Sequence, residues 1–350
     1  MKIVELTPER VPAYEALLAQ EEGSLFYASD LHRRLLARVL DEAEEHYLLA
    51  LEDDQVVGAL PLYRCVRPGV GTVINSLPYF GSHGGVIQAG ARAEVVSALL
   101  GRLDELAHEH PDAPPLSATL TLSPFLPPQH EAERGFSWDL EDDRIGQVTT
   151  LPEEPSEEAL FAIMHSKTRN MVRKAMKQGL EIRCDQGPVG FELIERLHRA
   201  RMEELRGHSK PSSFFRAVEE VAGPDDYRIY VASLEGKDVG VLLLFYYDGM
   251  VEYYLPAAEP EARSAQPLSG LIFRAMLDAV ERGYRTWNWG GTWRSQTGVY
   301  RFKSRWGAVD MPYRYLTKLY APDLPRRDLA PLQQAFPYFY LYPFSAREGS

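Results

Sequence analysis

The sequence has little that would support a disulfide framework, a metal site or a membrane span. It contains 2 cysteines in 350 residues and no Cys-x-x-Cys pair, which predicts free thiols in a reducing compartment. His108 and His110 have no third ligand near them in sequence, so no metal site is expected. The longest apolar run, residues 239–247, is far below the roughly 20 residues that a span needs. The N-terminus has no signal-peptide pattern, and together these absences predict a cytoplasmic protein without stable membrane insertion.

Basic residues are also in deficit, since 38 Lys and Arg stand against 50 Asp and Glu and give a net charge of -12. That balance argues against a protein with a generally basic, nucleic-acid-binding surface. The charges are unevenly distributed, however, because acids gather in residues 41–54 and 139–158. Residues 165–183 hold six cations against one acid, and residues 293–318 hold the same numbers. Two focused basic clusters on an acidic chain favour an anionic ligand.

The chain contains two similar halves. In each half an apolar strand, an acidic or glycine turn and a second strand form a predicted hairpin, and a Val-Gly pair aligns at Gly58 and Gly240. Helical spacing follows in residues 93–108 and 268–282, and strands follow at 116–122 and 285–289. The pattern predicts a duplicated α/β unit with a mixed central sheet flanked by helices.

The domain boundaries follow from this repeat and from an acidic, proline-containing stretch at residues 140–158. We expect a first domain over residues 1–150 and a second over residues 151–320. Residues 321–350 open with proline punctuation and then carry a run of aromatic side chains. Such a run rarely stays in water, so we expect this tail to pack on the body of the protein.

The first informative segment begins at Ser166, a good N-cap, and stops at Gly179, a good residue for the end of a helix. The predicted helix carries Lys167, Arg169 and Arg173, and the last two share a face through their i, i+4 spacing. That face is suited to phosphate contacts with a donor. The alternative interpretation is a solvated basic helix.

The second segment is a predicted buried strand that ends in Gly290 and Gly291 and is followed by a short helix presenting Lys303. The glycines permit a close backbone approach or a positive φ. A lysine near the end of such a strand can stabilise the oxyanion of an acyl-transfer intermediate. The alternative interpretation is a surface lysine.

These two segments together resemble the FemABX family within the GNAT acyltransferase superfamily. The string Lys-Thr-Arg-Asn…Arg-Lys-Ala…Lys-Gln-Gly, beginning at Lys167, resembles the signature that opens the family's second domain. The string Trp-Gly-Gly…Gly…Phe-Lys…Trp-Gly, beginning at Trp289, resembles its C-terminal signature. The resemblance covers roughly residues 3 to 320 and implies two tandem GNAT-like domains. Known members transfer an amino acid from aminoacyl-tRNA to an amine of a peptidoglycan precursor, and wider relatives acylate amines from acyl-CoA.

The resemblance implies roles for individual residues. Lys303 matches the family lysine that stabilises the oxyanion or the aminoacyl donor, and Arg206 matches an arginine that contacts precursor phosphate. In the segment Phe26 to Arg34, Arg34 stands where the family has a phosphate-binding lysine, and His32 stands where tryptophan is usual. Tyr79 and Tyr254 fall in segments where family tyrosines line the acceptor groove.

Two further loops give weaker signals. Residues 79–85 form a glycine-rich stretch containing His83, which is a tempting base although a lone loop histidine is more often structural. Residues 266–271 precede a helix and are a degenerate version of the acyl-CoA pyrophosphate loop.

The leading interpretation is therefore an N-acyltransferase or aminoacyltransferase that needs no bound cofactor. Its co-substrate is aminoacyl-tRNA or acyl-CoA, and its acceptor is an anionic small molecule or a peptidoglycan precursor. One alternative is an acyl-CoA-dependent N-acetyltransferase on the same fold. The other is a tandem GNAT protein that binds an anionic precursor without turning it over.

Overall fold

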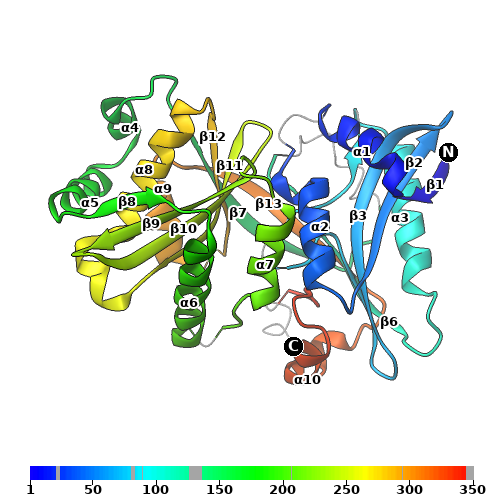
Figure 1. Cartoon of the computed structure of the whole chain (residues 1–350). Coiled ribbons are helices and arrows are strands. Elements are labelled where there is room, and N and C mark those ends of the chain that lie inside the picture. Colours follow the sequence, from blue (N-terminus) through cyan, green and yellow to red (C-terminus); the bar gives the residue numbers. More distant parts are fainter. Residues whose placement is uncertain are drawn as a thin grey trace. The chain divides into compact units, whose positions relative to one another are not determined.

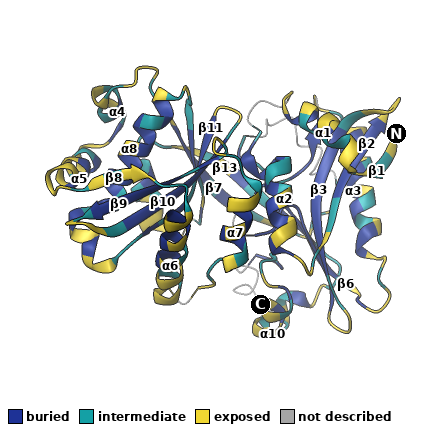
Figure 2. Cartoon of the chain, viewed as in Figure 1, coloured by how far each residue is buried: buried dark blue, intermediate teal, exposed yellow. Residues whose placement is uncertain are grey.

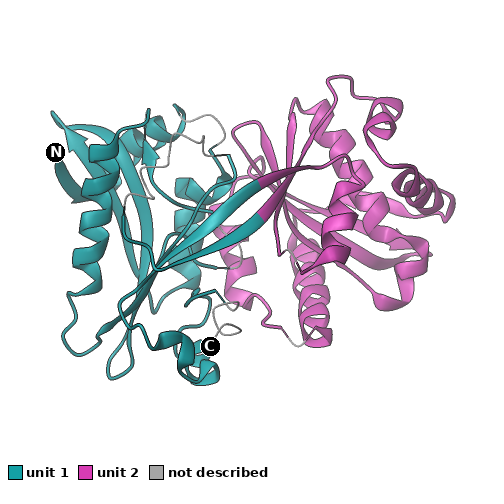
Figure 3. Ribbon diagram, turned by 180° about the vertical axis from the view of Figure 1, so that it is seen from behind, with its two compact units in different colours: residues 1–144, 312–350 teal, residues 145–311 magenta. Residues whose placement is uncertain are grey.

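The chain folds into two compact units, which we call unit 1 and unit 2. The computed structural model describes residues 1–20, 24–79, 83–88, 90–125, 136–205, 207–293 and 295–343. Unit 1 comprises residues 1–144 and 312–350, and unit 2 comprises residues 145–311 (Figure 3). The predicted α/β class, with a mixed central sheet flanked by helices, is confirmed (Figure 1).

Unit 1 is built on a sheet in the order β1-β2-β3-β4-β6-β13, in which β5 also pairs with β3. Its strands are β1 (Lys2–Glu5), β2 (Glu44–Glu52), β3 (Gln55–Arg67), β4 (Gly71–Asn75), β5 (Ile87–Gln88), β6 (Pro115–Thr121) and most of β13 (Val309–Leu319). Its helices are α1 (Val11–Leu18), α2 (Asp30–Val39), α3 (Ala93–Ala107) and α10 (Leu329–Ala335). The apolar face of α3 packs on β2 and β3 to form the core of this unit.

Unit 2 is built on a sheet in the order β7-β12-β11-β10-β9-β8. Its strands are β8 (Glu181–Cys184), β9 (Tyr227–Leu234), β10 (Lys237–Tyr247), β11 (Met250–Ala258), β12 (Thr286–Thr292) and the second half of β7 (Leu140–Thr150). Its helices are α4 (Glu157–Ile163), α5 (Ser166–Lys177), α6 (Pro188–Glu204), α7 (Ser212–Val221), α8 (Pro267–Glu281) and α9 (Thr297–Ser304). Helices α6 and α8 contact the same three strands, β9 to β11, so they cover opposite faces of the sheet (Figure 1).

The two predicted hairpins are confirmed, and their details show the same construction in both units. Left-handed residues make both turns, with φ of 48° at Asp53 in one and 52° at Glu235 in the other. Gly58 of β3 pairs with an alanine of β2, and Gly240 of β10 pairs with an alanine of β9. A Cβ on Gly58 would lie 2.3 Å from Val95 of α3, and one on Gly240 would lie 3.0 Å from Pro267 of α8. Each glycine therefore admits the covering helix close to its hairpin.

The order of elements after each hairpin is also repeated. Strand β4, helix α3 and the parallel strand β6 in unit 1 correspond to β11, α8 and the parallel strand β12 in unit 2. The next strand along the chain then pairs within the other unit. Residues 145–150 of β7 pair with β12, whereas residues 315–319 of β13 pair with β6. This exchange of the last strand assigns residues 145–150 to unit 2 and residues 312–320 to unit 1, on the other side of the predicted boundaries in each case.

The described part of the C-terminal tail packs on unit 1. Phe336 and Tyr342 are fully buried, and Leu341 lies in the same cluster as Val73 of β4 and Leu116 of β6. The Asn75 side chain donates to the Tyr340 carbonyl at 2.9 Å and accepts from its backbone amide at 2.6 Å. Figure 2 shows α10 with only one side buried. Within the described segments, no helix combines the length and hydrophobicity that crossing a membrane requires.

Candidate functional site

The end of helix α9 is held on the sheet of unit 2 by two polar contacts from β7, and a third contact joins β7 to β12. The Gln147 side chain donates to Ser304 Oγ at 2.9 Å, and Thr149 Oγ1 donates to the Trp306 carbonyl at 3.2 Å. Thr149 in turn accepts from Trp289 Nε1 at 2.9 Å. Trp306 itself is fully buried. These contacts fix the last turn of α9, which carries Lys303, against the end of β12.

Lys303 is buried, so its interpretation as a surface lysine is wrong. Its side chain is 6% exposed, and Nζ donates to the carbonyls of Gly290 at 3.2 Å and Gly291 at 3.1 Å and to Thr292 Oγ1 at 2.8 Å. Burial lowers the pKa of Lys303 to about 8, and the negative charge of Glu252 opposes part of this shift. The result is a desolvated ammonium at the end of β12.

The glycine turn that holds Lys303 is itself fixed by a buried carboxylate. Glu252 is 2% exposed and accepts from Asn288 Nδ2 at 2.7 Å. Asn288 Oδ1 accepts from the Gly290 backbone amide at 3.0 Å, and Gly290 adopts a φ of 68°. Glycine is needed here because a residue with a side chain is strained at this φ. The contacts therefore run from Glu252 through Asn288 and Gly290 to Lys303.

Strands β11 and β12 stop pairing where Glu252 meets Asn288. Their parallel register covers Met250–Glu252 and Thr286–Asn288, although both strands continue beyond it. A pocket of about 310 Å³ lies beside the continuation of β11. It is lined by Met171 of α5, Arg201 of α6, Phe302 of α9, residues 256–258 and 263, and residues 266–269 at the start of α8. Phe302 directly precedes Lys303 in α9, and Lys303 itself is not one of the residues that line the pocket.

The predicted donor-contact residues of α5 have different surroundings. Lys167 and Arg173 are exposed, and the Arg173 guanidinium lies 5.0 Å from the Phe161 ring. Arg169 is half-buried and donates to the carbonyls of Phe161 at 3.3 Å and Met164 at 3.0 Å. Arg169 therefore completes the end of α4, a contact that the i, i+4 spacing did not predict. The cap of α5 is also His165 rather than the expected Ser166, since His165 Nδ1 accepts from the Lys167 amide.

Tyr254, a predicted acceptor-groove residue, belongs to the same strand as Glu252. Its ring is half-buried and stacks on Phe214 of α7 with centroids 5.6 Å apart. Lys210 lies over both rings, with Nζ 4.8 Å from the Tyr254 centroid and 5.0 Å from that of Phe214. Unit 2 therefore places Lys303, on α9, against the end of β12 and Tyr254 on the neighbouring strand β11. Arg206 lies outside the described residues.

Arg34 and Tyr79 belong to unit 1. Arg34 is exposed on α2 and pairs with Asp30, with Nε and Oδ2 separated by 3.1 Å. Tyr79 is 1% exposed, has a φ of 86° and donates its backbone amide to the Tyr338 carbonyl at 3.1 Å. A tyrosine at this φ is strained, and the contact with the tail accounts for its position.

The two buried histidines in the described part of unit 1, His32 and His83, pack among aromatic rings. His32, which stands where the family has tryptophan, is buried, and its Nδ1 lies 2.9 Å from the Tyr27 carbonyl. His83 is also buried, with its ring 4.7 Å from that of Tyr313. These contacts agree with a structural role for His83.

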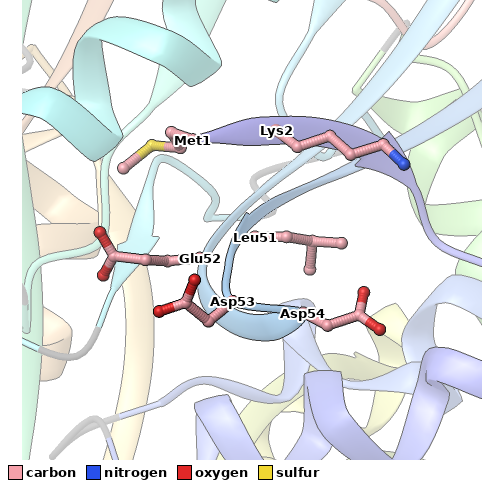
Figure 4. A pocket seen from close by; sticks show the side chains of 6 residues that line it. All are labelled: Met1, Lys2, Leu51, Glu52, Asp53 and Asp54. Carbon is pink, nitrogen blue, oxygen red and sulfur yellow. The ribbon is translucent and has the colours of Figure 1, made fainter.

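A second depression, of about 510 Å³, lies in unit 1 beside the turn between β2 and β3 (Figure 4). It is lined by Met1, Lys2, Leu51, Glu52, Asp53 and Asp54. Three carboxylates beside one lysine do not suit an anionic ligand, and none of the predicted site residues lies there. Across the described ranges, no group of three or more His, Cys, Asp or Glu side chains is arranged to hold a metal ion.

Sequence reasoning missed Glu252, Asn288, Thr292 and Lys210. A charged residue inside the apolar segment 250–257 was a usable signal for Glu252. Asn288 stood between two tryptophans of the second motif and received no separate role. Lys210 had no signal, since it is one cation in a polar loop.

Comparison with known proteins identifies the fold. Residues 165–304 match the family model for the acetyltransferase (GNAT) domain. The structure of FemX is similar over 96% of this chain and 100% of that one, with a TM-score of 0.69 and 14% identity. A tandem GNAT protein from the clavulanic acid biosynthesis pathway is similar over 92% of this chain and 99% of that one, with a TM-score of 0.55 and 16% identity.

A third similar structure is the C-terminal domain of a putative lysylphosphatidylglycerol synthetase from Agrobacterium fabrum. The similarity extends over 88% of this chain and 91% of that one, with a TM-score of 0.54 and 14% identity. No curated protein sequence matches this chain. The predicted resemblance to FemABX proteins within the GNAT superfamily is thus confirmed at the level of the fold, which is an acyltransferase fold.

Proposed function

We propose that this protein transfers an aminoacyl or acyl group onto an amine, with Lys303 stabilising the transition state. The observation that carries the proposal is the buried, desolvated ammonium of Lys303 at the end of β12. Its neighbour in sequence, Phe302, lines a pocket. In this reaction the amine nitrogen attacks an ester or thioester carbonyl, and negative charge develops on the carbonyl oxygen. A fixed positive charge in a water-poor site stabilises that oxygen more than it stabilises the neutral donor.

All three N–H groups of Lys303 already have acceptors, which limits how it acts. The contact to the Gly290 carbonyl, at 3.2 Å, is the longest of the three. A developing oxyanion is a stronger acceptor than a neutral carbonyl, so it would displace this contact first. Thr292 Oγ1, at 2.8 Å, would keep the ammonium in place.

The proposed donor is aminoacyl-tRNA, with acyl-CoA as the second candidate. Similarity to FemX and to a lysylphosphatidylglycerol synthetase domain supports an aminoacyl donor, and the exposed cations of α5 suit a polyphosphate backbone. Acyl-CoA is favoured by a separate observation, the pocket at the amino end of α8, where backbone amides and the helix dipole attract phosphate. The proposal uses no bound metal or prosthetic group and assigns the protein to the cytoplasm.

The proposed acceptor is the amine of an anionic, peptidoglycan-type precursor. In unit 2 we assign the aromatic ring of Tyr254 to this substrate, and the resemblance in sequence adds Arg206. Arg34 and Tyr79, in unit 1, are further residues that the resemblance assigns to it. Support comes from the resemblance in sequence and from the FemX fold. The alternative is a protein that binds the precursor without turning it over. In that case neither aminoacyl-tRNA nor acetyl-CoA should be consumed when the precursor is present.

The test is a transfer assay with aminoacyl-tRNA and acetyl-CoA as donors and a nucleotide-linked pentapeptide precursor as acceptor. We expect Lys303→Met to lower kcat by about 100-fold or more while KM changes little, because one oxyanion stabiliser contributes about that factor. The matched control is Lys237→Met, an exposed lysine at the turn between β9 and β10, which should behave as the wild type. Unchanged kcat in a folded Lys303→Met protein contradicts the assigned role.

A further inference from the structure

Glu252 is a charged residue buried inside unit 2, at the point where β11 and β12 stop pairing. It is 2% exposed, and the preceding pair of the register, Val251 and Trp287, consists of fully buried core residues. Burying a carboxylate is unfavourable unless hydrogen bonds and a nearby positive charge compensate for the lost water. The acid at this position therefore needs a reason beyond packing.

The corresponding position of unit 1 is neutral. The parallel pairing of β4 and β6 ends at Asn75 and Thr119, just as that of β11 and β12 ends at Glu252 and Asn288. Asn75 is equally buried, at 2% exposure, and its side chain bonds to the backbone of Tyr340 in the tail. The repeated fold thus accepts an uncharged amide here, so the charge of Glu252 serves a feature of unit 2 and not the fold.

Glu252 and Lys303 hold the glycine turn of β12 from opposite faces of the sheet. The end of α9 packs through Trp306 on the core face, to which Val251 points, so the adjacent Glu252 points to the other face. A Cβ built on Gly290 would lie 3.8 Å from Glu252 Oε1, which places the carboxylate against the turn. From the core side, Lys303 Nζ donates to both glycine carbonyls. The turn alone therefore separates the carboxylate from the ammonium.

The charge of Glu252 acts on Lys303 through this turn. Burial lowers the pKa of Lys303 to about 8, and the Glu252 charge opposes the shift because it favours the ammonium. The groups bonded to Nζ are the two glycine carbonyls and Thr292 Oγ1, none of which titrates.

Other elements packed on α9 contribute mainly neutral groups. From β7 these are Gln147 and Thr149, whereas Asp310 of β13 is bonded to the helix but exposed to solvent. Glu252 itself has a further interaction besides those described above, so its effect on Lys303 has to be isolated by paired variants.

We propose that Glu252 is a positioning residue for Lys303, which fixes the glycine turn that binds the ammonium and keeps that nitrogen charged. The inference rests on the proposed acyl transfer, in which Lys303 stabilises the oxyanion. Only the protonated form of Lys303 carries the positive charge that this role needs. Without the carboxylate, Lys303 would lose its proton at a lower pH, and the enzyme would lose activity there.

The test is kcat/KM for the acceptor as a function of pH, taken as the ratio of variant to wild type so that titration of the acceptor amine cancels. Glu252→Gln keeps an oxygen that accepts from Asn288 and removes the charge. The ratio should fall about tenfold between pH 6 and pH 9, because titration of Lys303 moves down by about one pH unit. A purely structural role would lower the ratio equally at every pH, so a constant ratio in folded Glu252→Gln overturns the inference.

The matched control is Asp310→Asn, which removes an exposed carboxylate that is bonded to Tyr300 of α9. Its ratio to wild type should not change with pH. If Asp310→Asn and Glu252→Gln have the same pH dependence, the change in net charge explains the effect and the inference is wrong.

Exchanging the two bonded partners gives a second variant, whose result does not depend on the folding of Glu252→Gln alone. In Glu252→Gln with Asn288→Asp, the amide of the first side chain donates to the carboxylate of the second, which also accepts from the Gly290 amide. The negative charge is then one hydrogen bond nearer to the turn, so the ratio to wild type should stay level or rise between pH 6 and pH 9. A tenfold fall over this range, about that of lost charge, overturns the inference.

Urea denaturation tests the same coupling without any substrate. The change in the free energy of unfolding caused by Lys303→Met is measured against pH in the wild type and in Glu252→Gln. It should begin to grow near pH 8 in the wild type and about one pH unit lower in Glu252→Gln. An onset at the same pH in both backgrounds overturns the inference.

Failure of this inference differs from failure of the proposed function. Absence of transfer by the wild type with every donor contradicts the function itself, whatever denaturation shows. Transfer that is lowered by Lys303→Met, with a constant ratio for Glu252→Gln, contradicts only the role of Glu252.

Discussion

At the scale of single residues, the buried ammonium of Lys303 couples stability to pH. Its pKa is about 8 in the folded protein, against an ordinary value of 10.5. Between these values the unfolded chain holds a proton that the folded chain has lost, so the free energy of unfolding rises as pH increases from 8 to 10.5. Below pH 8 both states are protonated and the contribution is constant. A lysine whose pKa is lowered by folding therefore gives a free energy of unfolding that increases with pH.

The measurement is urea denaturation of wild type and Lys303→Met from pH 7 to 10.5. The difference in unfolding free energy between them should grow on the order of 3 kcal/mol in favour of the wild type across this range. Lys237→Met, which removes an exposed lysine, should show a flat difference. A flat difference for Lys303→Met as well contradicts the buried, desolvated state of this lysine.

The same residues show where sequence reasoning stops. Lys303 followed from a motif, since Phe-Lys and Trp-Gly lie within five residues of one another. Its support did not follow, because the bond from Asn288 to Glu252 joins residues 36 apart in sequence and depends on the parallel register of two strands. The position of Lys210 over Tyr254 likewise depends on how a loop folds against a strand.

At the scale of elements, Gly307 shows why the second motif ends as it does. Its φ is 80°, and a Cβ there would lie 2.7 Å from the carbonyl oxygen of Ile163 at the end of α4. Gly298, in α9, has ordinary backbone angles and open space around it. Gly307 is required because of its positive φ and the nearby Ile163 carbonyl, whereas Gly298 could be replaced by a residue with a side chain.

We expect Gly307→Ala to lower the free energy of unfolding by about 2–4 kcal/mol, because a strained φ and a backbone clash add together. Gly298→Ala should be neutral or should stabilise the protein by up to about 1 kcal/mol, since alanine is the better helix former. Chemical denaturation of both variants measures this. Equal effects of the two substitutions would count against the close approach of α4 to Gly307.

Elements differ in how well the sequence predicts them. The hairpins and the helices at residues 93–108 and 268–282 are local patterns, and the structure has them within one or two residues. The last strand of each unit is not local. Residues 145–150 pair with β12 although they directly follow the first half of the chain. No periodicity distinguishes this pairing from pairing with β6, so the predicted boundaries missed the exchange.

At the scale of the whole molecule, a net charge of -12 coexists with the exposed cations of α5. The overall charge repels an anionic donor at long range, whereas the local cluster attracts it at short range. Salt screens distant interactions more strongly than close contacts, because the screening length is about 10 Å at an ionic strength of 0.1 M. The dependence on salt therefore separates the two contributions and also separates a polyanionic donor from a small one.

For aminoacyl-tRNA we expect kcat/KM to fall with increasing salt, with a logarithmic slope set by the number of phosphate contacts. Replacing the exposed Lys174 and Lys177 of α5 with Gln should lower kcat/KM at low salt and make the slope shallower by about 1.5, since two phosphate contacts are lost. Lys2→Gln with Lys237→Gln changes the net charge equally, at exposed positions outside α5, and should leave the slope unchanged. If both pairs change the slope alike, the net charge alone governs donor binding. If neither does, α5 does not contact the donor and the acyl-CoA candidate becomes the stronger one.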